Sequence, residues 1–121
     1  MPRWINEQGM TILKMDAVGM TMEQYLQEVD ATLKVLLASK PPPNSVLLLS
    51  EGEPPSGPLE GIRDAWKTFQ DGARGLIKAQ TVVGLRGFKR VIARLVQNDL
   101  YFAASMEDAM RYLLKKSGTQ S

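Results

Sequence analysis

The chain has 121 residues, the length of one domain, and 44% of them are hydrophobic, so it is long enough to form a single core. Its 15 basic and 13 acidic side chains give a net charge of +2, and it contains neither cysteine nor histidine. This composition excludes disulfides, cysteine nucleophiles, histidine acid–base catalysis and Cys/His metal sites. We therefore expect a protein that is not an enzyme and that holds no cofactor and no metal.

The apolar stretches are far shorter than the roughly 18 residues of a membrane span, and residues 1–10 lack the apolar run of a signal peptide. We therefore expect a cytoplasmic protein with no membrane span. Its single domain would cover residues 1–121, with residues 117–121 as a free tail.

The first elements in chain order are predicted to be a hairpin, or one strand with an irregular lead-in, and then a helix. Residues 4–5 and 11–15 are short β-like runs separated by the turn-rich spacer 6–9. Thr21 and Gln24 then fit a capping box, which predicts a helix start. The apolar face of this helix is expected to contain Met22, Leu26, Val29, Leu33, Leu36 and Leu37.

Two nearly uninterrupted apolar runs, 45–50 and 79–85, predict strands that are covered on both faces. We expect both to be central and parallel, because neither shows polar alternation. Between them Pro58 suits the first turn of a second helix. The buried stripe of that helix is expected to contain Leu59, Ile62, Trp66, Phe69 and Ala73.

The remaining chain predicts a third helix over residues 88–97, a strand over 100–104 and a last helix capped by Ser105. Strands and amphipathic helices thus alternate along the whole chain. The pattern predicts an α/β fold: one domain with a four- or five-stranded, mostly parallel sheet and right-handed crossovers.

Charge is distributed unevenly along the chain. Residues 1–71 carry ten acidic and six basic side chains, a net charge of −4. Residues 72–98 carry six basic side chains and no acidic one, which favours either an anionic partner or a solvated helix face beside the acidic half. We expect no nucleic-acid partner, because no aromatic residues interleave with these charges as a base-stacking platform. The six are Arg74, Lys78, Arg86, Lys89, Arg90 and Arg94.

The sharpest local motif is a glycine turn at a predicted helix start. Its backbone N–H groups and nearby cations could hold a phosphate or a carboxylate, and the alternative is a close strand–helix turn that needs small residues. The spacing fits neither a Walker loop nor a dinucleotide fingerprint. The candidate anion or partner site consists of Gly84, Arg86, Gly87, Lys89 and Arg90.

A second candidate site is the edge of the sheet where parallel strands end, since ligands in open α/β sheets bind there. Its acids could hold a divalent cation or a polar ligand, or could be hydrated loop residues, and no ligand spacing indicates a metal. We call this edge the strand-end rim, and we expect it to carry Asp16, Glu51, Glu53, Ser56, Arg86 and Ser105.

Residues 79–114, which include AQTVVGLRGFKRVIARLV and LYFAASMEDAMRYLL, resemble the C-terminal half of small bacterial SpoIIAA-like proteins of the STAS superfamily. The segment DAVGMTMEQY resembles the same family's first strand and helix start. The likeness covers roughly residues 11–115 and is carried by the order and spacing of motifs. It implies a (βα)n superhelical sheet with a leading antiparallel strand.

The resemblance also implies a non-enzymatic regulatory or protein-interaction module. Anti-sigma antagonists of this superfamily carry a phosphorylatable serine before the second helix, which makes Ser56 a possible phosphorylation site. The family's Asp is missing there, and prolines flank the site. The alternative is a small-molecule, anion or lipid-headgroup binder that uses the strand-end rim. Trp4 beside a short apolar leading strand also suggests a homodimer.

Overall fold

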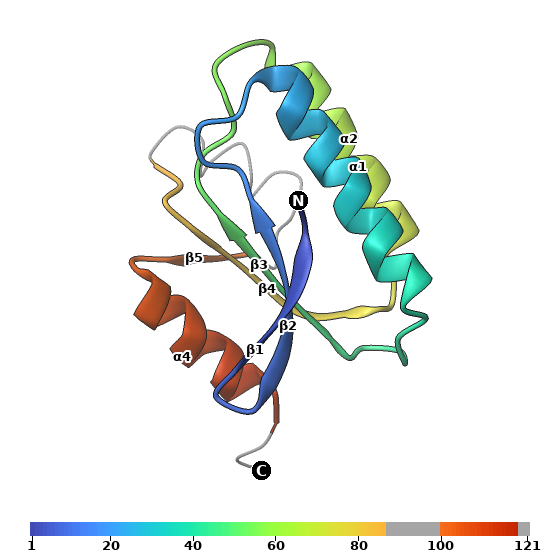
Figure 1. The fold of residues 1–121 in the computed structure, drawn as a ribbon, viewed down its shortest axis with the longest axis vertical. Coiled ribbons are helices and arrows are strands. Elements are labelled where there is room, and N and C mark those ends of the chain that lie inside the picture. Colours follow the sequence, from blue (N-terminus) through green and yellow to red (C-terminus); the bar gives the residue numbers. More distant parts are fainter. Residues whose placement is uncertain (87–99, 119–121) are drawn as a thin grey trace.

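Five strands form one sheet in the order β1-β2-β3-β4-β5 in a computed structural model that describes residues 1–86 and 100–118 (Figure 1). The strands are β1 (Arg3–Glu7), β2 (Met10–Asp16), β3 (Val46–Glu51), β4 (Ile77–Val83) and β5 (Tyr101–Ala103). The described helices are α1 (Met22–Ala38), α2 (Leu59–Gly72) and α4 (Met106–Lys116). The chain is therefore a single α/β domain.

β1 and β2 form the predicted antiparallel hairpin. Their connection is a two-residue turn, since Gln8 and Gly9 have φ angles of 51° and 79°, as a type I′ turn requires. The predicted four-residue spacer was too long. Asn6 and Glu7 belong to β1 and pair with β2, because the two positive φ angles complete the reversal by themselves.

β2, β3, β4 and β5 are parallel, with β3 at the centre of the sheet, so the prediction of central, parallel strands is confirmed. β4 spans residues 77–83, two positions earlier than predicted. Gly84, with a φ of 91°, turns the chain away from the sheet, and Ile77 pairs with Val46 at the other end. β5 is shorter than the predicted 100–104.

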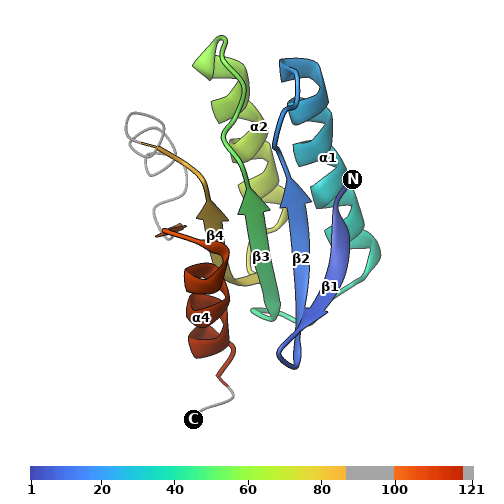
Figure 2. The same ribbon diagram turned by 60° about the vertical axis from the view of Figure 1, so that its left-hand side comes forward.

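The described helices lie on both faces of the sheet: α1 and α2 on one and α4 on the other (Figure 2). Two clusters of buried side chains fill the layers. Beneath α1 and α2 the largest fully buried members are Leu13, Met15, Val29, Leu36, Leu48 and Phe69. Beneath α4 they are Ile12, Leu49 and Leu113.

The predicted capping box of α1 is present: Thr21 Oγ1 accepts from the Gln24 N–H at 3.2 Å, and the Thr21 N–H donates to Gln24 Oε1 at 2.9 Å. Leu37 does not belong to the predicted apolar face of this helix, because its side chain is 45% exposed. Leu36 points into the core, and the next residue of a helix is turned away from it by about 100°. At α2, Pro58 is the N-cap residue rather than part of the first turn, and Leu59 is only half-buried.

The third predicted helix, 88–97, lies outside the described residues, and so do residues 119–121 of the predicted tail. Ser117, also placed in that tail, is the C-cap of α4, and its carbonyl accepts a hydrogen bond from Lys78 Nζ at 3.0 Å. Among the described helices, none has both the length and the apolar character needed to cross a membrane.

Candidate functional site

The strand-end rim is formed because parallel strands end at the same edge of the sheet. The strand register aligns Asp16 with Glu51, Glu51 with Val83, and Val83 with Ala103. One row of the sheet therefore runs directly beneath the loops that follow β2, β3, β4 and β5. Of the acids expected at the rim, Asp16 and Glu51 occupy neighbouring positions in this row.

Backbone hydrogen bonds hold these loops against one another. The Ala17 N–H donates to the Glu51 carbonyl, and the Gly52 N–H donates to the Val83 carbonyl, both at 2.8 Å. Gly52 has a φ of +100°, and a Cβ there would lie 2.9 Å from the backbone nitrogen of Val18. Only glycine fits this crossing, so the rim has a fixed backbone next to its acidic side chains.

Each acid of the rim has a partner of its own. Lys14 Nζ lies 3.0 Å from Glu51 Oε1, and the Val18 N–H donates to Asp16 Oδ1 at 3.2 Å. Glu53 Oε1 accepts from the backbone N–H of Arg86 at 3.2 Å. In residues 1–86 and 100–118, no three acids converge on a point where a metal ion could be held.

The glycine turn is described only in its first half. Gly84 and Arg86 lie within the described residues, whereas Gly87, Lys89 and Arg90 lie outside them. The Arg86 side chain is exposed, and its backbone N–H already binds the Glu53 carboxylate. An external anion would have to compete with this internal carboxylate.

Ser56 is exposed in the loop that leads from β3 to α2. Two residues later, Pro58 caps α2 without any side-chain hydrogen bond, so no cap side chain accepts from the first N–H groups of this helix. Glu60 adds an acid to the first turn, and a Cβ on Gly61 would meet nothing within 4 Å. The side-chain position of Gly61 is thus open, whereas a Cβ on Gly57, directly after Ser56, would lie 2.9 Å from the Met22 side chain.

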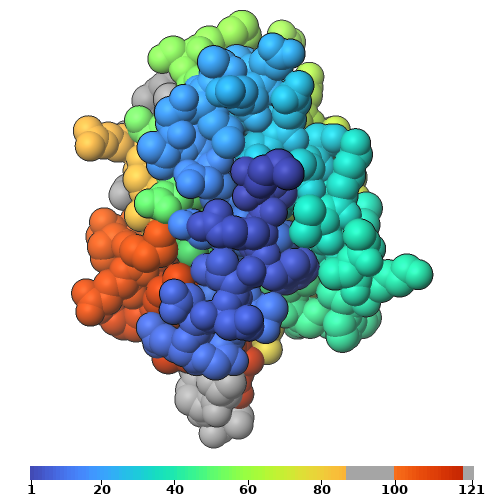
Figure 3. All heavy atoms as spheres, viewed as in Figure 1, coloured from blue at the N-terminus to red at the C-terminus, as the bar shows by residue number. Residues whose placement is uncertain are grey.

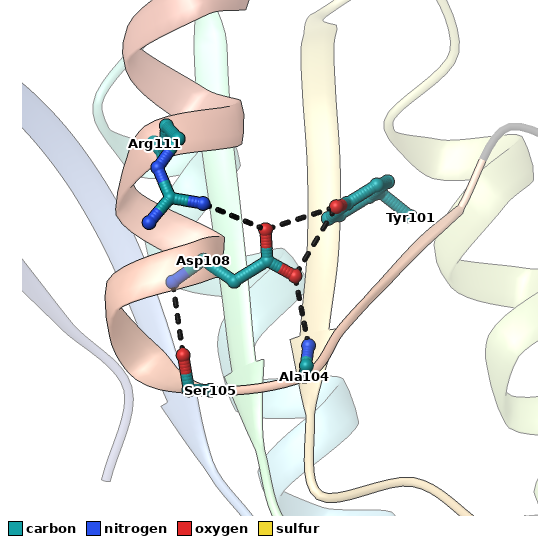
Figure 4. Close-up of polar contacts among 5 residues, drawn as sticks. All are labelled: Tyr101, Ala104, Ser105, Asp108 and Arg111. Atoms are coloured by element: carbon teal, nitrogen blue, oxygen red, sulfur yellow. Dashed lines mark hydrogen bonds and ion pairs between the residues drawn. The ribbon is translucent and has the colours of Figure 1, made fainter.

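The start of α4 is the opposite case, because the side chain of its N-cap residue accepts a hydrogen bond from the first turn (Figure 4). Ser105 Oγ accepts from the Asp108 N–H at 3.1 Å, as predicted for a helix cap. The Asp108 carboxylate accepts from the Ala104 N–H at 2.9 Å and from the Tyr101 hydroxyl at 3.0 Å, and it lies 3.7 Å from Arg111. The Ser105 hydroxyl, which was expected at the strand-end rim, therefore acts as the N-cap of α4.

These contacts move two pKa values in opposite directions. The hydrogen bond from the Ala104 N–H, followed by that from Tyr101, holds the pKa of Asp108 below its ordinary value. The same carboxylate raises the pKa of the Tyr101 hydroxyl. Asp108 lies in the first turn of α4, where the helix dipole favours an acid, but its partnership with Tyr101 carried no sequence signal.

Glu28 on α1 is a second feature that the sequence did not reveal. It is 6% exposed, and among the described residues its Oε2 is a buried side-chain oxygen without a hydrogen bond. The ammonium group of Met1 lies 3.2 Å away as an ion-pair partner. The burial of Glu28 had a signal in the sequence, namely its spacing: it lies three residues after Tyr25, on the buried face of α1.

A polar pocket of about 310 Å³ lies away from the rim, beside the first half of β4. It combines two amides, two lysines and a tyrosine with the strand backbone. Its lining consists of Gln70, Ile77, Lys78, Ala79, Gln80, Tyr112 and Lys116. One of the lysines, Lys78, is already bound to the end of α4.

Comparison with known proteins finds no matching family model, no matching curated protein and no matching solved structure.

Proposed function

We propose that this chain is a non-enzymatic protein-interaction module of the STAS type, whose partner binds the Ser56 loop and the start of α2. One observation carries the proposal: Ser56 is exposed directly before a helix whose N-cap residue provides no side-chain hydrogen bond. The Ser56 hydroxyl is thus exposed to a partner, and no cap side chain competes with that partner for the first N–H groups of α2.

The chemistry of this surface favours an acceptor from the partner. The first N–H groups of a helix lack intrahelical acceptors, and the helix dipole adds positive potential there. A carboxylate of the partner supplies the missing acceptor. Phosphorylation of Ser56 would place a competing anion beside the same groups and would change partner binding.

The resemblance supports this proposal at the level of topology. A mixed sheet with one antiparallel leading strand is compatible with the (βα)n arrangement that the resemblance implies. A bacterial, cytoplasmic setting is part of the proposal and rests on the resemblance and the sequence alone. We also propose that the chain pairs with a second copy of itself through β1.

Site-specific photo-cross-linking in the native host cells tests the partner surface. A photoreactive residue at position 56 is expected to capture a defined protein. When the photoreactive residue is placed at another position of the loop instead, Ser56→Asp should change the amount of that protein captured, whereas Ser56→Ala should not. Position 107, also exposed at a helix start but beside the capped α4, is the matched control. Equal capture of the same proteins at positions 56 and 107 would contradict the proposal.

A second candidate function is the binding of a small anion or a lipid headgroup at the glycine turn. It is favoured by two properties of Arg86. The side chain is exposed, and the backbone N–H of the same residue already binds the carboxylate of Glu53. Phosphate titration should shift the Arg86 amide resonance, more strongly in Glu53→Gln and less as salt rises. Equal shifts in wild type and Arg86→Ala would contradict it. Binding to vesicles is measured as well: binding to anionic but not to zwitterionic lipids would identify a lipid headgroup, and binding to neither would leave free phosphate as the ligand.

A further inference from the structure

β1 is an edge strand, and its outer side has no neighbouring strand in the described sheet. Four of its five residues are exposed, and Ile5 at its centre is half-buried. In Figure 3, which views the domain from this edge, the darkest blue residues lie uncovered between α1 and α4. The strand contains no proline and pairs with β2 without a bulge, so it lacks two common protections against edge pairing.

The hairpin register determines which backbone groups of β1 point outward. The residues that flank a two-residue turn, Glu7 and Met10, form a hydrogen-bonded pair, and such pairs alternate along an antiparallel ladder. Every second residue of β1 counted from Glu7 therefore turns its N–H and C=O toward β2. The residues between them, Trp4 and Asn6, present theirs to the open edge.

We propose that two copies of the chain pair antiparallel along β1, with Ile5 on the two-fold axis. This inference rests on the self-association proposed above and adds its register. With Ile5 opposite the partner's Ile5, Trp4 lies opposite the partner's Asn6, and their outward N–H and C=O groups meet as hydrogen-bonded pairs. The two five-stranded sheets become one continuous sheet.

Charge complementarity selects this register. Arg3 and Glu7 stand two residues on either side of Ile5, so each Arg3 lies opposite the partner's Glu7. These are non-hydrogen-bonded pairs, in which opposite side chains approach most closely. The other registers that match outward groups are centred on Trp4 or on Asn6, and each places a charged residue opposite the partner's Ile5.

Within residues 1–86 and 100–118, neither of these two charges, those of Arg3 and Glu7, is part of an ion pair. Arg3 pairs across the hairpin with Lys14, a like charge, and Lys14 is bound to Glu51 at 3.0 Å. Arg3 thus has no carboxylate partner among the described residues of the monomer and gains one in the dimer.

Charge reversal measured by analytical ultracentrifugation tests the pairing. The wild type is expected to reach about twice 13.4 kDa at micromolar concentration. Arg3→Glu and Glu7→Arg should each weaken dimerisation by about 10- to 100-fold, because each creates two repulsive pairs across the axis. The double variant Arg3→Glu/Glu7→Arg restores both attractions and should dimerise like wild type. Arg63→Glu, an exposed site on α2 with the same change of charge, is the control and should change nothing.

Mixing the two single variants gives the sharpest result. A chain with acids at positions 3 and 7 is complementary to a chain with bases at both, so the mixture should form a heterodimer although neither variant dimerises well alone. Misfolding of a single variant cannot produce this recovery, and circular dichroism of each variant confirms its fold. A mixture that stays monomeric while wild type dimerises would overturn the register.

Cysteine substitution reports the register directly, since the chain has no cysteine of its own. Ile5→Cys places two thiols in a non-hydrogen-bonded pair with Cα atoms about 4.5 Å apart, within the range that a disulfide spans. It should cross-link faster than Trp4→Cys or Asn6→Cys, and faster cross-linking at position 4 or 6 would overturn the register. A wild type that stays monomeric would overturn self-association itself, whereas a dimer that is indifferent to both charge reversals would overturn only the register.

Discussion

The indole Nε1–H of Trp66 donates a hydrogen bond to the hydroxyl of Tyr25 at 2.7 Å, inside the layer formed by α1 and α2. The two residues are 41 positions apart and are 7% and 3% exposed. Burial raises the pKa of the Tyr25 hydroxyl to about 12, although the hydrogen bond from Trp66 acts in the opposite direction. This contact connects the two helices by a buried polar pair.

Removing the Tyr25 hydroxyl should destabilise the fold. Tyr25→Phe leaves the buried Trp66 N–H without its acceptor, and we expect the free energy of unfolding to fall by about 1–3 kcal/mol at neutral pH. Above pH 10 the difference should shrink. The unfolded tyrosine loses its proton near pH 10 and the folded one near 12, so the contribution of Tyr25 is complete below pH 10 and is lost as pH rises to about 12.

Urea denaturation of both proteins from neutral pH to about pH 12 measures this effect. The wild type should lose roughly 2–3 kcal/mol more than Tyr25→Phe over the alkaline part of the range. Parallel curves for the two proteins would show that the folded-state pKa of Tyr25 is not raised.

Leu48 lies on the central strand β3 and is fully buried beneath α1 and α2. Leu48→Ala should lower the free energy of unfolding by about 2–5 kcal/mol, through lost burial and the cavity left behind. Leu37→Ala on α1 is the matched control, because Leu37 is 45% exposed, and its cost should be below about 1 kcal/mol. Denaturant unfolding gives both values, and a similar loss for the two variants would contradict the assigned core.

Gly52 should not tolerate a side chain. Gly52→Ala combines a positive φ with contacts of 2.9 Å to the backbone nitrogen and side chain of Val18, whereas Gly75→Ala has a positive φ and open space. Each substitution strains the backbone by about 1–3 kcal/mol, and only Gly52→Ala adds a steric clash. Thermal unfolding should therefore give a clearly lower Tm for Gly52→Ala, and equal Tm values would contradict the close packing of the rim loops.

Asp108 should make the stability of the fold depend on acidic pH. Because the Ala104 N–H and the Tyr101 hydroxyl lower its folded pKa, the carboxylate contributes stability above its ordinary pKa of 3.8, and this contribution is lost as pH falls through the folded value. Asp108→Asn should therefore show a smaller loss of stability than wild type between neutral and strongly acidic pH. Acid titration followed by circular dichroism measures the difference, and identical profiles would exclude this role.

The alternation of elements was predictable because it depends on residues close in sequence. The unbroken apolar run of β3, the capping box of Thr21 and the cap of Ser105 each act over a few positions, and all three appear in the structure. Two element limits that were predicted wrongly, those of the first turn and of β4, also depend on local structure. The limits of the turn at Gln8 and of β4 at Gly84 depend on backbone dihedral angles that composition does not specify.

The residues of the rim could be predicted to meet, because parallel strands end together, but their partners could not. Whether Glu53 binds a metal, an anion or the Arg86 N–H depends on loops that are 33 residues apart in sequence. In the same way only the tertiary structure pairs Tyr25 with Trp66 and buries Glu28. Sequence periodicity determines which face of an element is apolar, whereas sheet register and helix packing determine which distant polar groups come within hydrogen-bond distance.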